Sequence, residues 1–320
     1  MQLDVSPRMR MAILVALAAA SIATYMLAGA NGNWGFVLPF RGAKLAAMLL
    51  VAFAIAVSTV LFQAITHNRI LTPSVMGFDA LYILIQALMV LGMGIDPGQG
   101  EDRQTAQFLV EVAAMTGFAC LLFWGVFNGA AHSLHLMLLM GIVFGLLFRS
   151  LSGFVVRLID PNEFAYLQDR MFASFSAIET GLLWACALAI GLASAIAWRL
   201  RRSYDVLALG RDVAVNLGVP YRRTVMATLV AVSVMVAVST ALVGPVLFFG
   251  LLVSNLAYVT MGSDRHRWLV PAAVLWAVIF LVGGQALLER ILKLNATISI
   301  VIEFAGGLLF LLLVTRRKQT

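Results

Sequence analysis

The sequence predicts an all-α polytopic membrane protein with about ten transmembrane helices in two halves of inverted topology. Of its 320 residues, 62% are hydrophobic and 12% are charged, whereas soluble domains carry about 25% charged residues. Apolar runs long enough to cross a bilayer recur along the whole chain. A weak internal repeat, with matching helix breaks, relates the first part of the chain to the second.

The apolar runs define the expected spans. At roughly 17 to 25 residues per span, the sequence predicts helices near 11–30, 43–65, 76–94, 106–128, 134–156, 180–198, 222–243, 245–261, 268–288 and 297–315. The first run follows Arg8 and Arg10 and shares features with a signal peptide. Because it is as long as a bilayer span requires, we expect it to be a membrane helix.

Basic residues set the expected orientation. With the N-terminus inside, most of them lie in cytoplasmic segments, as the positive-inside rule requires. These residues are Arg8, Arg10, Arg69, Arg199, Arg201, Arg202, Arg211, Arg222, Arg223, Arg265, Arg267, Arg316, Arg317 and Lys318. The even number of spans returns the C-terminus to the cytoplasm. The net charge of +7 then reflects loops facing anionic lipid, and nucleic-acid binding is not expected.

The segment 199–223 is the longest polar interruption near the middle of the chain. It keeps a series of apolar residues, and Gly210 and Gly218 divide it into two short helical pieces. A loop that needed only solvation would not retain so much apolar surface. The pattern favours a docking element for a cytoplasmic partner, and the alternative is an amphipathic segment lying on the lipid headgroups.

The repeat rests on two matched features. Val51–Thr59 (VAFAIAVST) aligns with Val232–Thr240 (VSVMVAVST), and the third and eighth spans are both short and interrupted. Pro73, Gly77 and Asp79 open the third span, while Gly244, Pro245 and Gly250 open the eighth. Because five spans separate the copies, they cross the membrane in opposite directions, as in many transporters. We place the halves at about 1–178 and 179–320 of one transmembrane domain.

Several motifs carry a family resemblance. KLAAMLLVAFAIAVSTVLFQ with NRILTPSVMG resembles helix two and the following loop of iron-siderophore ABC-importer permeases, the FecCD family. LALGRDVAVNLGVPYRR resembles the coupling segment of that family, and GPVLFFGLLV resembles its GPIxFxGL motif. The resemblance spans nearly the whole chain. It implies a type II ABC importer subunit that moves a ferric siderophore inward by alternating access.

The departures from the family pattern narrow the expected substrate. NRIL at Asn68–Leu71 replaces NPLA, Val253–Asn255 (VSN) replaces VPH, and Thr297–Ser299 replaces PxG. The sequence NRILTPSVMGFDALY resembles that of a subgroup in which two different permease chains pair and carry catecholate or mixed siderophores. The alternatives are a cobalamin or haem importer permease and a proton-coupled secondary transporter.

The resemblance also implies partners and site residues. The partners are a second permease, two ATPase subunits that use ATP and magnesium, and a substrate-binding protein, all at the bacterial cytoplasmic (inner) membrane. The coupling residues are Leu207, Leu209, Gly210, Ala214, Leu217, Gly218 and Val219. Binding-protein docking is assigned to exposed basic residues Arg41, Lys44 and Arg290, where Lys44 replaces an arginine and so lacks its bidentate fork. The alternative role for these residues is headgroup anchoring.

The chain carries no motif for catalysis. It has no GxxxxGK[ST] sequence to cradle ATP phosphates, so an ATPase must act in trans. His132 and His135 are three residues apart, but no cysteine or carboxylate accompanies them, so we expect no metal site there. No recognisable Ser-His-Asp arrangement appears. We therefore expect a transport subunit that binds no cofactor and is not itself an enzyme.

Charged and flexible residues inside the spans suggest a translocation path. Glu111, Glu179 and Glu303 lie within or at the edge of apolar runs, where a carboxylate faces a cavity or a partner helix, or is kept neutral. Glu303 is assigned to the path together with Met137, Met140 and Phe144. Helix packing alone is the alternative explanation for these positions.

Overall fold

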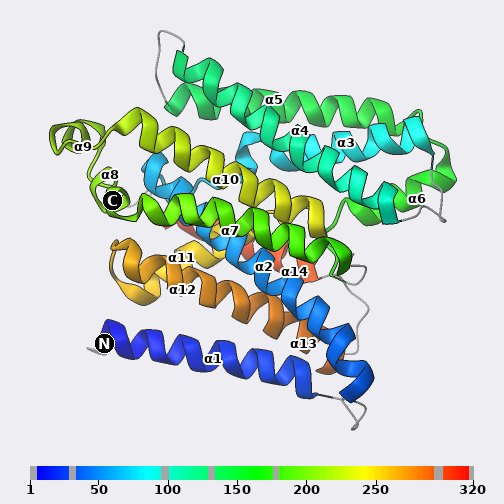
Figure 1. The fold of residues 1–320 in the computed structure, drawn as a ribbon, viewed down its shortest axis with the longest axis horizontal. Helices are drawn as coiled ribbons and strands as arrows, with labels where there is room; N and C mark the ends of the chain where they lie inside the picture. Colours follow the sequence, from blue (N-terminus) through cyan, green and yellow to red (C-terminus); the bar gives the residue numbers. More distant parts are fainter. Residues whose placement is uncertain are drawn as a thin grey trace.

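The computed structural model describes residues 6–28, 34–94, 101–128, 134–175, 180–291 and 298–316, and this part of the chain is helical. The elements are α1 (Pro7–Leu27), α2 (Trp34–Thr66), η1 (Pro73–Met76), α3 (Phe78–Met93), α4 (Glu101–Asn128), α5 (Leu134–Val156), α6 (Pro161–Arg170), η2 (Thr180–Leu182), α7 (Leu183–Arg199), α8 (Arg201–Leu207), α9 (Arg211–Asn216), α10 (Tyr221–Val243), α11 (Phe249–Met261), α12 (His266–Val278), η3 (Ile279–Gly283), α13 (Gly284–Ala286), η4 (Leu287–Ile291) and α14 (Ile298–Arg316). The long helices lie side by side along one direction (Figure 1).

Each predicted span coincides with a helical segment. Among the described residues, six helices are long and apolar enough to cross a membrane, and α7 with α8 forms a seventh candidate that bends by 60°. The segments Phe78–Gly92, Phe249–Met261 and Ser299–Leu311 are shorter apolar helices. Two of these three follow the breaks that the sequence indicates, so the interruptions explain their reduced length.

Two features differ from the sequence prediction. Helix α2 begins at Trp34, nine residues or about two and a half turns before the expected start at residue 43, and contains Pro39. Helix α6 was not predicted. The Asp160 carboxylate caps it by accepting a hydrogen bond from the Asn162 amide at 2.9 Å, and Pro161 occupies its first turn.

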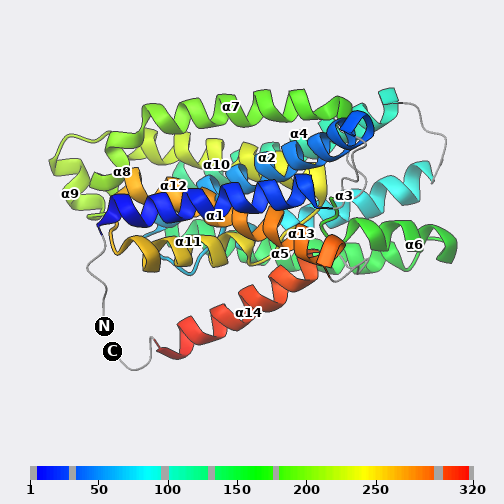
Figure 2. The ribbon, with the colours of Figure 1, turned by 90° about the horizontal axis from the view of Figure 1, so that it is seen from below.

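Helices α2 and α10, which carry the two copies of the repeat, form the centre of the bundle. Within the most apolar window of each helix, 67% of the residues of α2 and 78% of those of α10 are buried, against 17% for α1 and 22% for α5. The peripheral helices therefore expose most of their apolar surface to whatever surrounds this chain. Helix α14 lies inclined at the edge of the bundle (Figure 2).

The two helix breaks pack in equivalent ways. At the first, Gly77 adopts a φ of +88° and lies so close to α5 that an added Cβ would be 2.9 Å from the Cα of Gly145. At the second, Phe248 adopts a φ of +56° and lies against Gly306 of α14. Each break thus packs against a glycine in the last predicted span of its own half, which agrees with the inverted repeat.

Helices α8 and α9 lie at the same end of the bundle as the first turn of α1, and α6 lies at the opposite end (Figure 1). The helix that begins at α12 continues through two π-helical segments, η3 and η4, with α13 between them. Together these segments form one continuous helix from His266 to Ile291.

Candidate functional site

Two short helices at one end of the bundle form the segment that the sequence singles out. Helix α7 ends at Arg199, and α8 leaves it at an angle of 60°. Gly210, with a φ of +106°, separates α8 from α9, and Gly218, with a φ of +80°, follows α9. Since L-residues rarely adopt these angles, the two glycines are what allow the chain to turn. The prediction of two short helical pieces is confirmed.

The predicted coupling residues fall into two groups. Leu207 and Ala214 are fully buried and hold the segment against the bundle, with Val219 partly buried beside them. Leu209 and Leu217 are each 63% exposed, and their neighbours Val213 and Val215 are exposed too. A short segment that buries one apolar face and presents another has the form of a docking element.

Hydrogen bonds from three different helices fix α8. The hydroxyl of Thr228 in α10 donates to the hydroxyl of Tyr204 at 3.3 Å. Nε2 of His67, just past the end of α2, lies 2.6 Å from the carbonyl oxygen of Leu207. Burial raises the pKa of Tyr204, so its phenol stays neutral at ordinary pH.

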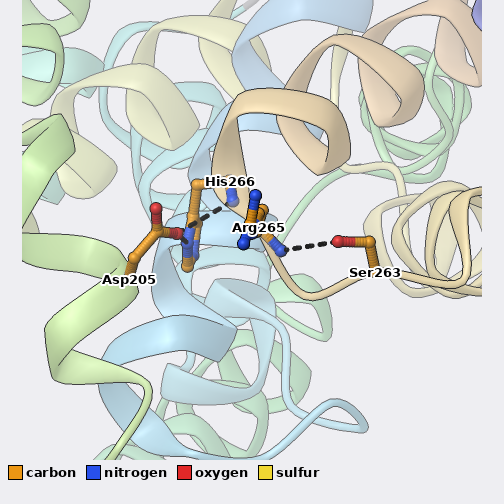
Figure 3. A network of polar contacts seen from close by, with 4 residues as sticks. All are labelled: Asp205, Ser263, Arg265 and His266. Atoms are coloured by element: carbon orange, nitrogen blue, oxygen red, sulfur yellow. Dashed lines mark hydrogen bonds and ion pairs between the residues drawn. The ribbon is translucent and has the colours of Figure 1, made fainter. Parts of the chain in front are cut away.

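Asp205 makes the third contact, with the start of α12 (Figure 3). Its Oδ1 accepts the backbone N–H of His266 at 3.0 Å and lies 2.7 Å from the ring Nδ1 of the same residue. Burial acts to raise the pKa of Asp205, but the hydrogen bonds and charge of His266, with the charge of Arg265, outweigh it and lower the pKa below its ordinary value. A carboxylate of α8 therefore caps α12 from outside that helix.

The sequence alone does not reveal these anchoring residues. His67 lies far in sequence from Leu207, and Asp205 lies far from His266, so each contact forms only through the tertiary fold. The one available signal was their position, since all lie close to predicted cytoplasmic helix ends. Position alone does not pair a histidine with a particular carboxylate.

The predicted docking residues are engaged within the chain. Arg41 is only 5% exposed, and its guanidinium donates to the carbonyl oxygens of Met26 and Ala28, both at 2.9 Å, at the end of α1. Lys44 pairs with Glu289 at 2.5 Å. The expectation of an exposed side chain is wrong for Arg41, because the last carbonyls of α1 need donors. The side chain of Arg290 lies outside the described residues.

The side chains of α5 that are predicted to line the translocation path pack against other helices of this chain. Met137 is fully buried, Met140 is partly buried, and Phe144 packs edge-on against Phe118 of α4 with ring centroids 5.3 Å apart. The open side of α5 carries other residues, among them Leu139, Ile142, Val143 and Leu146. Glu303 of α14 is half-buried.

Of the remaining candidate residues, one is packed inside the chain, and the side chains of the others lie outside the described residues. Glu111 is buried and accepts a hydrogen bond from Gln86 at 2.8 Å. Glu179 and His132 lie outside the described residues, as does the side chain of His135. In the described ranges no three histidine, cysteine, aspartate or glutamate side chains gather as metal ligands.

Comparisons with known proteins agree with this architecture. Residues 8–316 match the model of the FecCD transport family. The chain is 43% identical over 98% of its length to the petrobactin import system permease protein YclO of Bacillus subtilis, covering 99% of that protein. It is 33% identical to the petrobactin import system permease protein FatC of Bacillus anthracis, over 88% of this chain and 79% of that protein.

A solved structure shares the fold. An ABC transporter of metal-chelate type in an inward-facing conformation superposes with a TM-score of 0.83, covering 97% of this chain and 99% of its own, at 20% sequence identity. At this identity the likeness concerns the arrangement of the helices.

Proposed function

The chain belongs to the FecCD transport family, and from that premise we propose that it is the permease through which a bacterial ABC importer takes up ferric petrobactin or a closely similar catecholate siderophore. It is a membrane-spanning transport subunit and not an enzyme. The substrate assignment is supported by two relatives named for petrobactin import, at 43% and 33% identity.

An ABC importer permease works with an ATPase and a binding protein. We assign two ATPase subunits to the cytoplasmic side and a second permease to the membrane, forming a dimer that encloses the path. The open apolar sides of α5 and α14 support this pairing, because Ile142, Val143, Ile300 and Phe304 are all exposed. In a bacterial cytoplasmic membrane with both termini inside, α8 and α9 would then face the ATPase.

The observation that carries the coupling role is the two-sided form of α8 and α9. Leu207 is fully buried and Leu217 is 63% exposed, so the segment is anchored to the bundle and offers an apolar surface outward. ATP binding and hydrolysis in the partner would move this segment, and its contacts with α2, α10 and α12 would pass the motion into the membrane helices. Lys44 and Arg290 remain the proposed contribution of this chain to binding-protein docking.

Reconstitution in liposomes tests the class of transport. With binding protein, second permease and ATPase present, we expect uptake of ferric petrobactin that requires ATP inside the vesicle. Omitting the ATPase should abolish uptake, and an uncoupler should leave it intact. Uptake that persists without the ATPase, or that stops only with the uncoupler, would contradict the proposal. Competition by cobalamin or haem at equal concentration would reassign the substrate without changing the class.

A further inference from the structure

A small cavity lies where the two halves of the chain meet. It has a volume of about 20 Å³, enough for about one water-sized particle. It is enclosed by α2, the break before α3, α10 and the break before α11. Its polar lining comes from Ser58, Thr59, Thr72, Ser74, Asp79, Ser239 and Thr240.

The repeat explains why hydroxyl groups gather here. The alignment of Val51–Thr59 with Val232–Thr240 pairs Ser58 with Ser239 and Thr59 with Thr240, and both pairs line the same cavity. The cavity therefore lies between equivalent positions of the two copies, beside both helix breaks. In secondary transporters built from inverted repeats, coupling ions bind at the interface between the repeats.

Asp79 contributes a carboxylate with an unused oxygen. The side chain is 5% exposed, and its Oδ2 has no hydrogen-bond partner in the described structure, while Ser74 donates a hydrogen bond to the carboxylate. Asp79 lies in the first turn of α3, where the helix dipole favours a negative charge. An unpaired carboxylate at this depth is costly unless a cation or a donor reaches it.

The neighbouring hydroxyls offer lone pairs. Ser58 donates its proton to the carbonyl oxygen of Ile55 at 3.1 Å, and Ser239 donates to that of Val236 at 3.0 Å. Each serine oxygen is therefore left as an acceptor toward the cavity. Together with Oδ2 of Asp79, these hydroxyls line the cavity with oxygen acceptors. The positive charge of Arg149 also acts on the Asp79 carboxylate.

We propose that this cavity binds one sodium ion, held by the carboxylate of Asp79 and the hydroxyl oxygens of Ser58 and Ser239. A single carboxylate among neutral oxygens balances a monovalent cation, whereas divalent cations such as calcium take several carboxylates. The bound ion would join α2, α3 and α10 at the junction of the two halves. The inference does not depend on which chelate the permease carries.

Equilibrium binding of radioactive sodium to the full-length permease in lipid nanodiscs tests the site, with choline chloride keeping the ionic strength constant. We expect saturable binding of about one ion per chain. Asp79→Asn keeps the shape of the side chain and removes its charge, and should weaken binding at least about tenfold. The double variant Ser58→Ala and Ser239→Ala removes two ligands and should weaken it as well.

Ser233→Ala is the matched control. Ser233 is also fully buried in α10 and donates to the carbonyl oxygen of Leu229 at 2.7 Å, but it does not line the cavity, so this variant should bind sodium as the wild type does. If Asp79→Asn does not fold, the serine double variant decides. No saturable sodium binding by the wild type, or unchanged binding in the folded variants, would overturn the proposal and leave the cavity to a water molecule. Equal loss in Ser233→Ala would place the ion elsewhere.

Discussion

At the scale of single residues, the glycines of α5 set how closely the first helix break can approach. A Cβ on Gly141 would be 2.9 Å from the Cα of Met76, whereas one on Gly153 of the same helix would meet no atom within 4 Å. The backbone at Met76 has little freedom to yield, because Gly77 beside it already holds a φ of +88°.

We predict that Gly141→Ala destabilises the protein by about 1–3 kcal/mol, the usual cost of forcing a methyl group into a packed contact. Gly153→Ala places the same group on an open face of the same helix and should leave stability unchanged or slightly raised. Thermal unfolding of the two variants in the same detergent measures the difference. Equal melting temperatures would show that the break is not packed as described.

Asp205 predicts a pH dependence with a definite sign. The pKa of its carboxyl is lowered in the folded state, so its contribution to stability is fully present above the unfolded value of about 3.9. That contribution is lost as the pH falls through the folded pKa. Because Asp205 is 49% exposed, solvent screening keeps the effect small.

Melting curves between pH 7 and pH 3 compare the wild type with Asp205→Asn. The variant keeps an acceptor for the His266 amide but loses the charge, so it should melt lower at neutral pH, and the difference should shrink below about pH 4. A difference that stays constant over this range would mean that the charge of Asp205 does not stabilise the start of α12.

At the scale of elements, the exposed face of α8 and α9 is the part most open to a direct test. We predict that Leu217→Asp separates ATP hydrolysis from transport without unfolding the permease. An unpaired carboxylate in the contact would cost at least a few kcal/mol, which lowers ATPase affinity by about two or more orders of magnitude. Leu217→Ala removes packing without adding charge and should cause a smaller loss.

Co-purification of the ATPase and uptake in vesicles are the readouts, with the melt of the permease as the stability control. Leu207→Ala provides the contrast, because Leu207 is fully buried, and its truncation should lower the melting temperature by creating a cavity. Intact co-purification and normal uptake with Leu217→Asp would mean that the segment lies on the membrane surface.

Most elements could be predicted from the sequence, since apolar runs and the glycines at 210 and 218 act locally. The lengths of the apolar runs placed every span, and the proline and glycine residues placed both breaks. The sequence did not predict α6, because the only signal for that helix is an aspartate followed by a proline. It also did not predict that the side chain of Arg41 is buried. That burial depends on the carbonyls at the end of α1, which the sequence does not pair with Arg41. The sequence also does not show which side of α5 is packed, because the helix is apolar all round.

At the scale of the whole molecule, the fold predicts which ends face the cytoplasm. Helices α6 and α9 lie at opposite ends of the bundle (Figure 1), and each carries an exposed asparagine, Asn162 in α6 and Asn216 in α9. We predict that, after Cys120 and Cys186 are replaced by alanine, Asn162→Cys reacts with a membrane-impermeant maleimide in intact spheroplasts. Asn216→Cys should react only after the membrane is opened. The reverse pattern would invert the topology and remove α8 and α9 from the ATPase side.

The helix from α12 to η4 has fixed attachments at both ends. Asp205 holds its first residue, and Lys44 of α2 pairs with Glu289 near its last turn. At the α-helical rise of 1.5 Å per residue, the segment from His266 to Ile291 would be at most about 39 Å long, which is enough to cross a hydrocarbon core of about 30 Å. If α8 couples to an ATPase as proposed, a push on it would be passed along this helix towards Lys44 and Glu289. The wider turns of η3 and η4 lie on that route.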